Sequence, residues 1–163
     1  MTLKLGAKAP VFSAPADDGS TVDLSKLLER GNVVLYFYPK DETQGCTAEA
    51  CSFRDRWEEI RSEDATVVGV SSDSVGAHLS FKKHHDLPFT LVSDRDKKIR
   101  EAYGVKGRLL PPRVTFVIDR AGIIRHVYDS QMAPTRHVRE ALQALQAIQK
   151  GPTAGKPATA LTP

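Results

Sequence analysis

The chain has 163 residues, of which 40% are hydrophobic and 26% charged, and its formal net charge is +3. These values are typical of one soluble globular domain. The lysines and arginines are spread along the chain without a long block of like charge, which disfavours nucleic-acid binding. No apolar stretch approaches the roughly 20 residues that cross a bilayer, and the N-terminus does not resemble a secretory signal, so we expect no membrane association and a cytoplasmic location.

The first half of the chain predicts a hairpin, a helix, a strand and a second helix. Two short apolar pieces around the turn-like "DDGS" indicate a β-hairpin, with a short helix at 24–29. Residues 32–39 form a continuous apolar run, typical of a strand in a parallel sheet, which Pro39 ends. From Gly45 the apolar residues step by four, three, four and three, which is one face of a single helix: Cys46, Ala50, Phe53, Trp57 and Ile60.

Strands and helices then continue to alternate. The segments that follow predict strands at 66–73 and 88–94, a helix at 74–86, a helix from Asp94 as N-cap to Gly104, a hairpin of 113–119 and 123–129, and a final helix at 134–150. This order predicts an α/β fold with a central mixed β-sheet flanked by helices and an N-terminal β-hairpin extension. We expect one domain over 1–150 and a disordered tail over 151–163.

Cys46 and Cys51 are the only two cysteines of the chain and follow the first apolar run closely. In the first turn of a helix, Cys46 would lie near free backbone N–H groups and the positive end of the helix dipole, which favour the nucleophilic thiolate. Lys40 would add to this effect. The acidic neighbours would oppose ionisation: Asp41, Glu42 and Glu49.

The spacing of the two cysteines restricts how they can react. Five helical positions separate their Cα atoms by about 7.5 Å along the axis and turn them about 140° apart, beyond the roughly 7 Å limit of a disulfide. An intact helix therefore excludes the bond, and a disulfide would need local unwinding. A metal site would need two further ligands, and no histidine has a tight ligand spacing with the cysteines; His84 and His85 are expected on a solvated helix end. A structural disulfide, a metal site and a redox pair remain open at this point.

Pro39, Thr43 and Cys46 match the Pro-x-x-x-Thr-x-x-Cys signature of the peroxiredoxins. The chain resembles the bacterioferritin comigratory protein, or peroxiredoxin Q, branch from about residue 3 to 148, with "TAEACSFRD" after the signature. Gln44 departs from the branch, where many members have proline. The resemblance implies a thioredoxin-like fold and reduction of hydrogen peroxide or alkyl hydroperoxides. It implies neither a cofactor nor a metal.

The resemblance also implies the roles of five residues. Cys46 would be the peroxidatic cysteine, oxidised to a sulfenic acid, and Cys51 the resolving cysteine, which forms an intramolecular disulfide with it. Thioredoxin or a similar dithiol would reduce that disulfide. Arg113 would stabilise the thiolate, Thr43 would hydrogen-bond the sulfur or the peroxide, and Pro39 would shield the thiolate from water. A monomer is expected.

Two other functions remain compatible with the same residues. One is a non-enzymatic thiol redox sensor, in which unwinding of the helix is the output. The other is a protein-disulfide reductase, although the Cys-x-x-Cys motif typical of that class is absent. The residues do not rank hydrogen peroxide against organic hydroperoxides.

Overall fold

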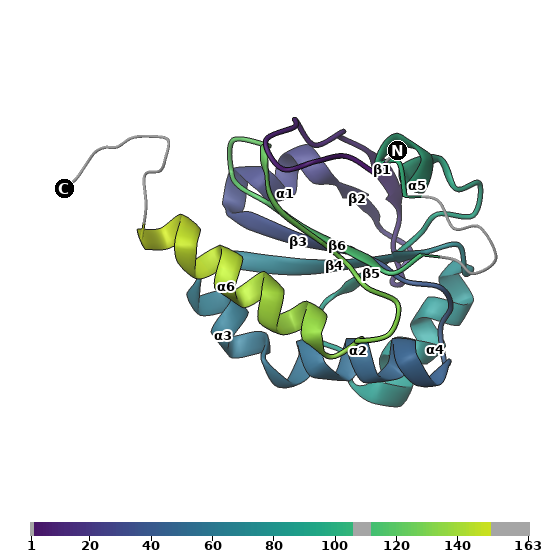
Figure 1. The fold of residues 1–163 in the computed structure, drawn as a ribbon. Coiled ribbons are helices and arrows are strands. Elements are labelled where there is room, and N and C mark those ends of the chain that lie inside the picture. The colour runs from purple at the N-terminus through teal and green to yellow at the C-terminus, as the bar shows by residue number, and fades with distance from the viewer. Residues whose placement is uncertain (1, 106–111, 151–163) are drawn as a thin grey trace.

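The computed structural model describes residues 2–105 and 112–150. A five-stranded sheet runs through the middle of the molecule and helices cover both of its faces (Figure 1). In chain order the elements are β1 Ser13–Pro15, β2 Thr21–Asp23, α1 Leu24–Arg30, β3 Asn32–Phe37, α2 Gln44–Asp55, α3 Trp57–Ser62, β4 Ala65–Ser71, α4 Val75–His85, β5 Thr90–Ser93, α5 Lys98–Ala102, β6 Val114–Ile118, β7 Ile124–Asp129 and α6 Arg136–Lys150.

The sheet is mixed, as the alternation of elements predicted. Its strand order is β5-β4-β3-β6-β7. The central strand β3 pairs in parallel with β4 and antiparallel with β6. Every residue of β3 is buried, which explains its continuous apolar run. The N-terminal strands β1 and β2 form a separate antiparallel pair, so the predicted hairpin extension is confirmed.

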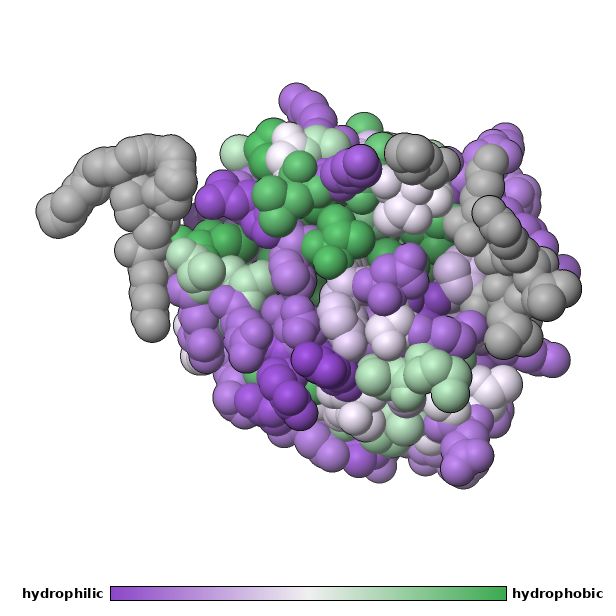
Figure 2. Space-filling model, viewed as in Figure 1, coloured by the Kyte–Doolittle hydropathy of each residue, from purple (hydrophilic) through white to green (hydrophobic). Residues whose placement is uncertain are grey.

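Alternate residues of β3 enter two different hydrophobic cores. Val33, Leu35 and Phe37 pack on the face that carries α1 and α5. Val34 and Tyr36 face the opposite side, where α2, α4 and α6 pack. On the face of the molecule in view, Figure 2 shows the strongest hydrophobic colour in the upper half, on the side of α1, and mainly hydrophilic colour below.

The predicted helix through Cys46 and Ile60 is wrong in one respect. The chain breaks it at Arg56, which has φ −107° and ψ 16°, and a separate short helix, α3, follows. Ile60 and Phe53 are both fully buried, so the apolar periodicity continues across the break. A three-to-four residue period reports which side chains are buried and does not require one unbroken helix.

Several predicted boundaries also shift. The strand predicted at 32–39 ends at Phe37, two residues before Pro39. Asp94 is not the N-cap of α5, which is Lys97, but its carboxylate accepts the N–H groups of Ile99 and Arg100 at 3.0 Å each and so serves the same end of the helix.

The C-terminal part of the described chain agrees with the predicted pattern. The hairpin β6–β7 is confirmed, and α6 buries the predicted stripe on the core that contains α2: Val138, Ala141, Leu142 and Leu145, with Ile148 packed against it. The tail predicted at 151–163 lies outside the described residues. No helix of the described part is long and apolar enough to cross a membrane.

Candidate functional site

Cys46 lies at the start of α2, which follows the central strand β3 along the chain. It occupies the first turn of α2, and its side chain faces the sheet with 1% of its surface exposed. Its apolar neighbours in the same core include Tyr36 and Ala50. The predicted position of Cys46, on the buried face at the start of a helix, is therefore what the structure shows.

Two donors approach the Cys46 sulfur. The backbone N–H of Lys40 lies 3.5 Å from Sγ, and Nη1 of Arg113 lies 3.6 Å from it. Burial raises the pKa of the Cys46 thiol, while Lys40, Thr43 and Arg113 lower it without reversing the direction. The expectation of a thiolate from the helix terminus is therefore incomplete, because desolvation of the closed pocket opposes it.

Arg113 immediately precedes β6, and β6 lies beside the central strand β3 in the sheet. From this position its side chain reaches the Cys46 sulfur. The residue is only 5% exposed, and its Nε donates to Oε1 of Gln131 at 3.2 Å. Gly45 makes room for the guanidinium, since a Cβ there would lie 2.9 Å from Nη2 of Arg113. No sequence pattern pointed to this role of Gly45, because the approach of Arg113 depends on residues far apart in the chain.

Glu49 shares Arg113 with the cysteine. It lies one helical turn after Cys46 on the same face of α2, is completely buried, and accepts from Nη1 of Arg113 at 2.6 Å. Burial raises the pKa of Glu49 to about 8, although Arg113 lowers it. Burial therefore favours the neutral form of the Glu49 carboxyl and weakens the opposition to the thiolate that we expected from it, while the bond to Arg113 acts in the other direction.

His137 completes this buried group, and no sequence pattern pointed to it. Its Nε2 donates to the carbonyl of Ser130 at 2.8 Å, which makes Nδ1 the acceptor of the neutral ring. Nδ1 faces the Thr115 hydroxyl at 2.8 Å and Oε2 of Glu49 at 3.5 Å. Burial lowers the pKa of His137 to about 4, so the ring is neutral at neutral pH. Oε2 of Glu49 has no hydrogen-bond partner among the described residues.

Thr43 holds the loop in front of the sulfur. It occupies the N-cap position of α2, but its hydroxyl makes no capping bond and instead donates to the carbonyl of Lys40 at 2.8 Å. The same Lys40 presents its N–H to Cys46, so Thr43 orients a donor to the sulfur. Pro39 lies near the start of this loop and is half-buried.

A buried hydrogen-bond network anchors the other side of this loop. The carboxylate of Asp41 accepts from the Tyr38 hydroxyl at 2.5 Å and lies 2.7 Å from Nδ1 of His78. The backbone N–H of Asp41 donates to Asp73 at 2.8 Å, and Nε2 of His78 donates to the carbonyl of Val92 at 3.0 Å. These bonds fix the loop between β3 and α2 to α4 and the neighbouring strands.

Cys51 lies on the same helix as Cys46, partly exposed, and both cysteines are free thiols. The structure therefore describes the dithiol form, in which α2 is intact. A disulfide between the two cysteines would require α2 to unwind. Cys46, Arg113 and the Thr43–Lys40 loop are brought together, whereas Cys51 stands apart from them.

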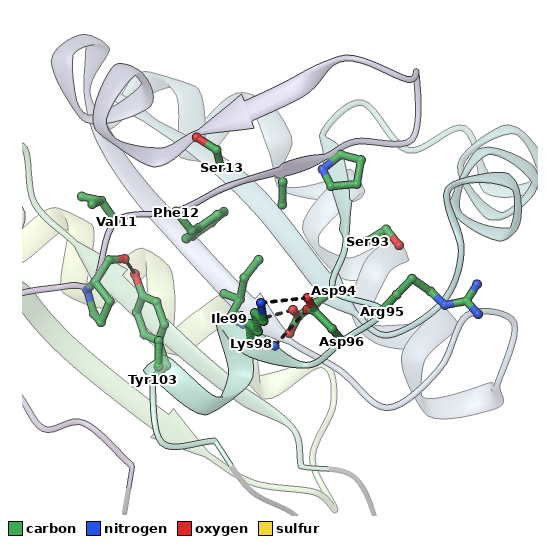
Figure 3. A pocket seen from close by; sticks show the side chains of 14 residues that line it. Val11, Phe12, Ser13, Ser93, Asp94, Arg95, Asp96, Lys98, Ile99 and Tyr103 are labelled. Carbon is green, nitrogen blue, oxygen red and sulfur yellow. Dashed lines mark hydrogen bonds and ion pairs between the residues drawn. The ribbon is translucent and has the colours of Figure 1, made fainter.

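The cavity of about 440 Å³ drawn in Figure 3 is separate from this site. It lies between the N-terminal segment and α5, and Figure 3 shows Phe12, Ile99 and Tyr103 around it together with the Asp94 carboxylate that caps α5. Neither Cys46 nor Arg113 lines it. The Cys46 sulfur is buried and lies outside this cavity.

Comparison with known proteins places the chain in a protein family. The model of the AhpC/TSA family matches residues 5–127. The chain is 44% identical over 146 residues to peroxiredoxin Q, chloroplastic, of Oryza sativa subsp. japonica, a match that covers 88% of this chain and 67% of the relative. It is also 44% identical over 147 residues to the peroxiredoxin Q, chloroplastic, of Sedum lineare, covering 88% of this chain and 78% of that one.

Solved structures agree in fold and sequence. Peroxidoxin BcpB of Mycobacterium tuberculosis superposes with a TM-score of 0.85 at 37% identity and covers 90% of this chain and 98% of its own. The bacterioferritin comigratory protein of Xanthomonas campestris, described for its alkyl peroxide reduction activity, gives a TM-score of 0.77 at 30% identity, over 84% and 91% of the two chains.

Proposed function

Because this chain belongs to the AhpC/TSA family and is a thiol peroxidase of the peroxiredoxin Q type, we propose that Cys46 is its peroxidatic cysteine. The Cys46 thiolate attacks one oxygen of the peroxide, the O–O bond breaks, and the sulfur becomes a sulfenic acid. The departing oxygen takes up a proton and leaves as water or an alcohol. The sulfur is oxidised by two electrons and the peroxide is reduced by the same two.

The observation that carries this proposal is the position of Arg113. Its Nη1 lies 3.6 Å from Sγ of a sulfur that is otherwise buried among apolar side chains. The guanidinium stays protonated, so it favours the thiolate and the negative charge that develops on the departing oxygen. The Lys40 N–H, held by Thr43, adds a second donor on the loop side. Pro39 begins this loop and limits the access of water to the sulfur.

Cys51 acts in the second step. With Cys46 as a sulfenic acid, the Cys51 thiol attacks that sulfur, a disulfide forms and water leaves. The intact helix keeps the two residues apart, so this step follows local unwinding of α2. Thioredoxin or a similar dithiol then reduces the disulfide by exchange through a mixed disulfide.

The same chemistry supports proposals for the substrates, the cellular location and the oligomeric state. The proposed substrates are hydrogen peroxide and alkyl hydroperoxides, the latter supported by the activity described for the Xanthomonas campestris relative. Two working thiols need a reducing compartment, which supports a cytoplasmic location. Both cysteines reside on one helix, so a monomer can complete the cycle.

The test is a coupled assay with thioredoxin, thioredoxin reductase and NADPH. Addition of hydrogen peroxide should start NADPH consumption in the wild-type protein, and Cys46→Ser should abolish it. Cys51→Ser should allow one oxidation of Cys46 but lose most turnover with thioredoxin. An unchanged rate in Cys46→Ser would overturn the assignment of the peroxidatic residue, and an unchanged rate in Cys51→Ser would remove Cys51 from the cycle.

A further inference from the structure

Glu42, His84 and His85 form a cluster of possible metal ligands outside the peroxidase pocket. Glu42 belongs to the loop between β3 and α2, and the two histidines are the last residues of α4. Oε2 of Glu42 lies 2.9 Å from Nδ1 of His84, and Oε1 lies 3.0 Å from Nε2 of His85. The imidazole rings lie beside each other with centroids 4.2 Å apart, so one carboxylate faces a nitrogen from each ring.

We propose that these three side chains bind a divalent transition-metal ion of the Zn²⁺ class. Two imidazoles and one carboxylate are a donor set that binds Zn²⁺ with a fourth position left to water. For metal–ligand bonds of about 2.0–2.1 Å in tetrahedral geometry, neighbouring donors lie about 3.3 Å apart. The N–O separations of 2.9 and 3.0 Å therefore need to open by only a few tenths of an ångström.

The surroundings favour a nitrogen-preferring metal over Ca²⁺ or Mg²⁺. Only one carboxylate is present in the cluster, whereas those two ions prefer several oxygen ligands. The guanidinium of Arg54 donates to the carbonyl of His85 at 2.7 Å, so a positive charge already stands close by. Binding must then come from directional coordination by the imidazoles and not from general attraction of cations.

A second cluster of three ligand atoms offers a useful contrast. Asp41, Asp73 and His78 also converge, but their polar atoms are committed to the network that anchors the loop. Both ring nitrogens of His78 face protein acceptors, and Asp41 is buried. The Glu42 cluster differs because its side chains are largely at the surface and can exchange a proton for a metal ion: His84 and Glu42 are 66% and 44% exposed.

The position of the site links metal binding to the cysteines. Glu42 lies four residues before Cys46 and adopts a left-handed φ of 64°, and Arg54, on α2 beyond Cys51, is bonded to the end of the same α4. Both cysteines are therefore flanked by attachments to α4. A metal ion that joins Glu42 to the two histidines holds the start of α2 against α4 and slows the unwinding that precedes disulfide formation. This consequence rests on the proposed function, whereas the metal site itself does not.

Binding is tested with tag-free protein that carries Cys46→Ser and Cys51→Ser, because thiolates would themselves bind the metal. Titration calorimetry with Zn²⁺ at about pH 7.5, where an ordinary imidazole is mainly neutral and has a free nitrogen lone pair, should give one ion per chain. Adding Glu42→Gln, His84→Ala or His85→Ala should weaken binding by about tenfold or more. His126→Ala is the matched control, since His126 pairs with a single carboxylate, that of Glu140, elsewhere.

The outcomes of that titration separate clearly. Weakened binding in the three ligand variants and unchanged binding in His126→Ala support the site. Absence of a one-to-one complex, or binding that survives His84→Ala and Glu42→Gln, would overturn it. Because the titrated variant has no cysteine, either result is independent of whether the peroxidase cycle is assigned correctly.

The link to unwinding is tested with both cysteines present. After one equivalent of hydrogen peroxide, disulfide formation is followed by rapid quenching and mass measurement, with and without Zn²⁺ at about ten times its dissociation constant. If unwinding requires release of the ion, the rate should fall about tenfold in the wild type and in His126→Ala, and less than about twofold in His84→Ala. Equal slowing in His84→Ala would mean that the ion acts at the thiols, and would overturn the link.

Discussion

At the scale of single residues, the reactivity of Cys46 depends on the guanidinium of Arg113, which also bonds Glu49. Arg113 contacts the Cys46 sulfur and the Glu49 carboxyl through the same Nη1 atom. Burial raises the pKa of both Cys46 and Glu49, so each prefers its neutral form in the closed pocket. When Glu49 is neutral, the charge of Arg113 is left to stabilise the Cys46 thiolate, which attacks the peroxide in the proposed reaction.

Gly45→Ala should separate activity from stability at this site. The new Cβ would lie 2.9 Å from Nη2 of Arg113, the mobile end of a long side chain, so the guanidinium moves rather than the backbone. A displaced guanidinium should lower kcat/KM for peroxide by roughly tenfold or more. Stability should change little, because the preference of alanine for the helix offsets the strain on the buried Arg113–Glu49 pair.

The measurement pairs peroxidase kinetics with a urea unfolding curve. Gly76→Ala in α4 is the control, since its Cβ would meet only the Ser74 hydroxyl at 4.0 Å. That variant should keep full activity. Full activity in Gly45→Ala would show that the exact place of Arg113 is not needed.

At the scale of elements, the proposed cycle needs α2 as a helix in the first reaction and unwound in the second. As a helix it holds Cys46 beneath Arg113 and keeps Cys51 out of bonding distance. Its attachments to the rest of the fold therefore set the rate of the second step. One of them is the bond from Nη1 of Arg54 to the carbonyl of His85, at 2.7 Å.

Arg54→Lys should loosen that attachment while it keeps the positive charge near Cys51. Lysine lacks the planar guanidinium that reaches the His85 carbonyl in a fixed geometry. Loss of about 0.5–1 kcal/mol from the closed form should speed disulfide formation roughly two- to fivefold after one peroxide equivalent, measured by quenching and mass.

Arg56→Lys provides the comparison, because Arg56 forms its ion pair with the exposed Glu59 at the start of α3. Its rate should match the wild type. An equal acceleration in both variants, or none in Arg54→Lys, would contradict the idea that this bond restrains α2.

At the scale of the whole molecule, Glu49 and His137 bury one proton between α2 and α6. In the folded chain Glu49 keeps its proton up to about pH 8 and His137 stays neutral down to about pH 4. In the unfolded chain between about pH 4.5 and 6.5, the carboxyl is ionised and the imidazole protonated. Both states of this pair then hold one proton, so its effects on the pH dependence of stability cancel in that window.

Single substitutions should reveal two opposite dependences of the free energy of unfolding on pH. In Glu49→Gln, only His137 remains; its pKa is lower in the folded state, so stability should rise between about pH 4.5 and 6.5, on the order of 2 kcal/mol. In His137→Gln, only Glu49 remains; its pKa is higher in the folded state, so stability should fall over the same window.

Urea unfolding of the wild type and both variants across this window gives the three slopes, compared as differences because other groups titrate in all of them. Parallel curves for Glu49→Gln and His137→Gln would show that the buried pair does not hold the proton as described.

The sequence by itself determined the fold class and most of the succession of elements, and it singled out the stretch with Cys46 and Cys51 as the candidate site. These follow from local information: apolar periodicity marks strands and helix faces, and the spacing of Cys46 and Cys51 excludes a disulfide within a helix. The roles assigned to Arg113 and Thr43 came from the resemblance, and the structure places both beside the Cys46 loop.

Only the tertiary structure decided which distant groups meet. The order of β3 and β6 in the sheet brings Arg113 to Cys46, and the packing of α6 on α2 brings His137 to Glu49. The protonation of these groups depends on desolvation, which exists only once the core has closed around them. The cluster of Glu42 with the end of α4 has the same origin, because its ligands are brought together by packing and not by spacing in the chain.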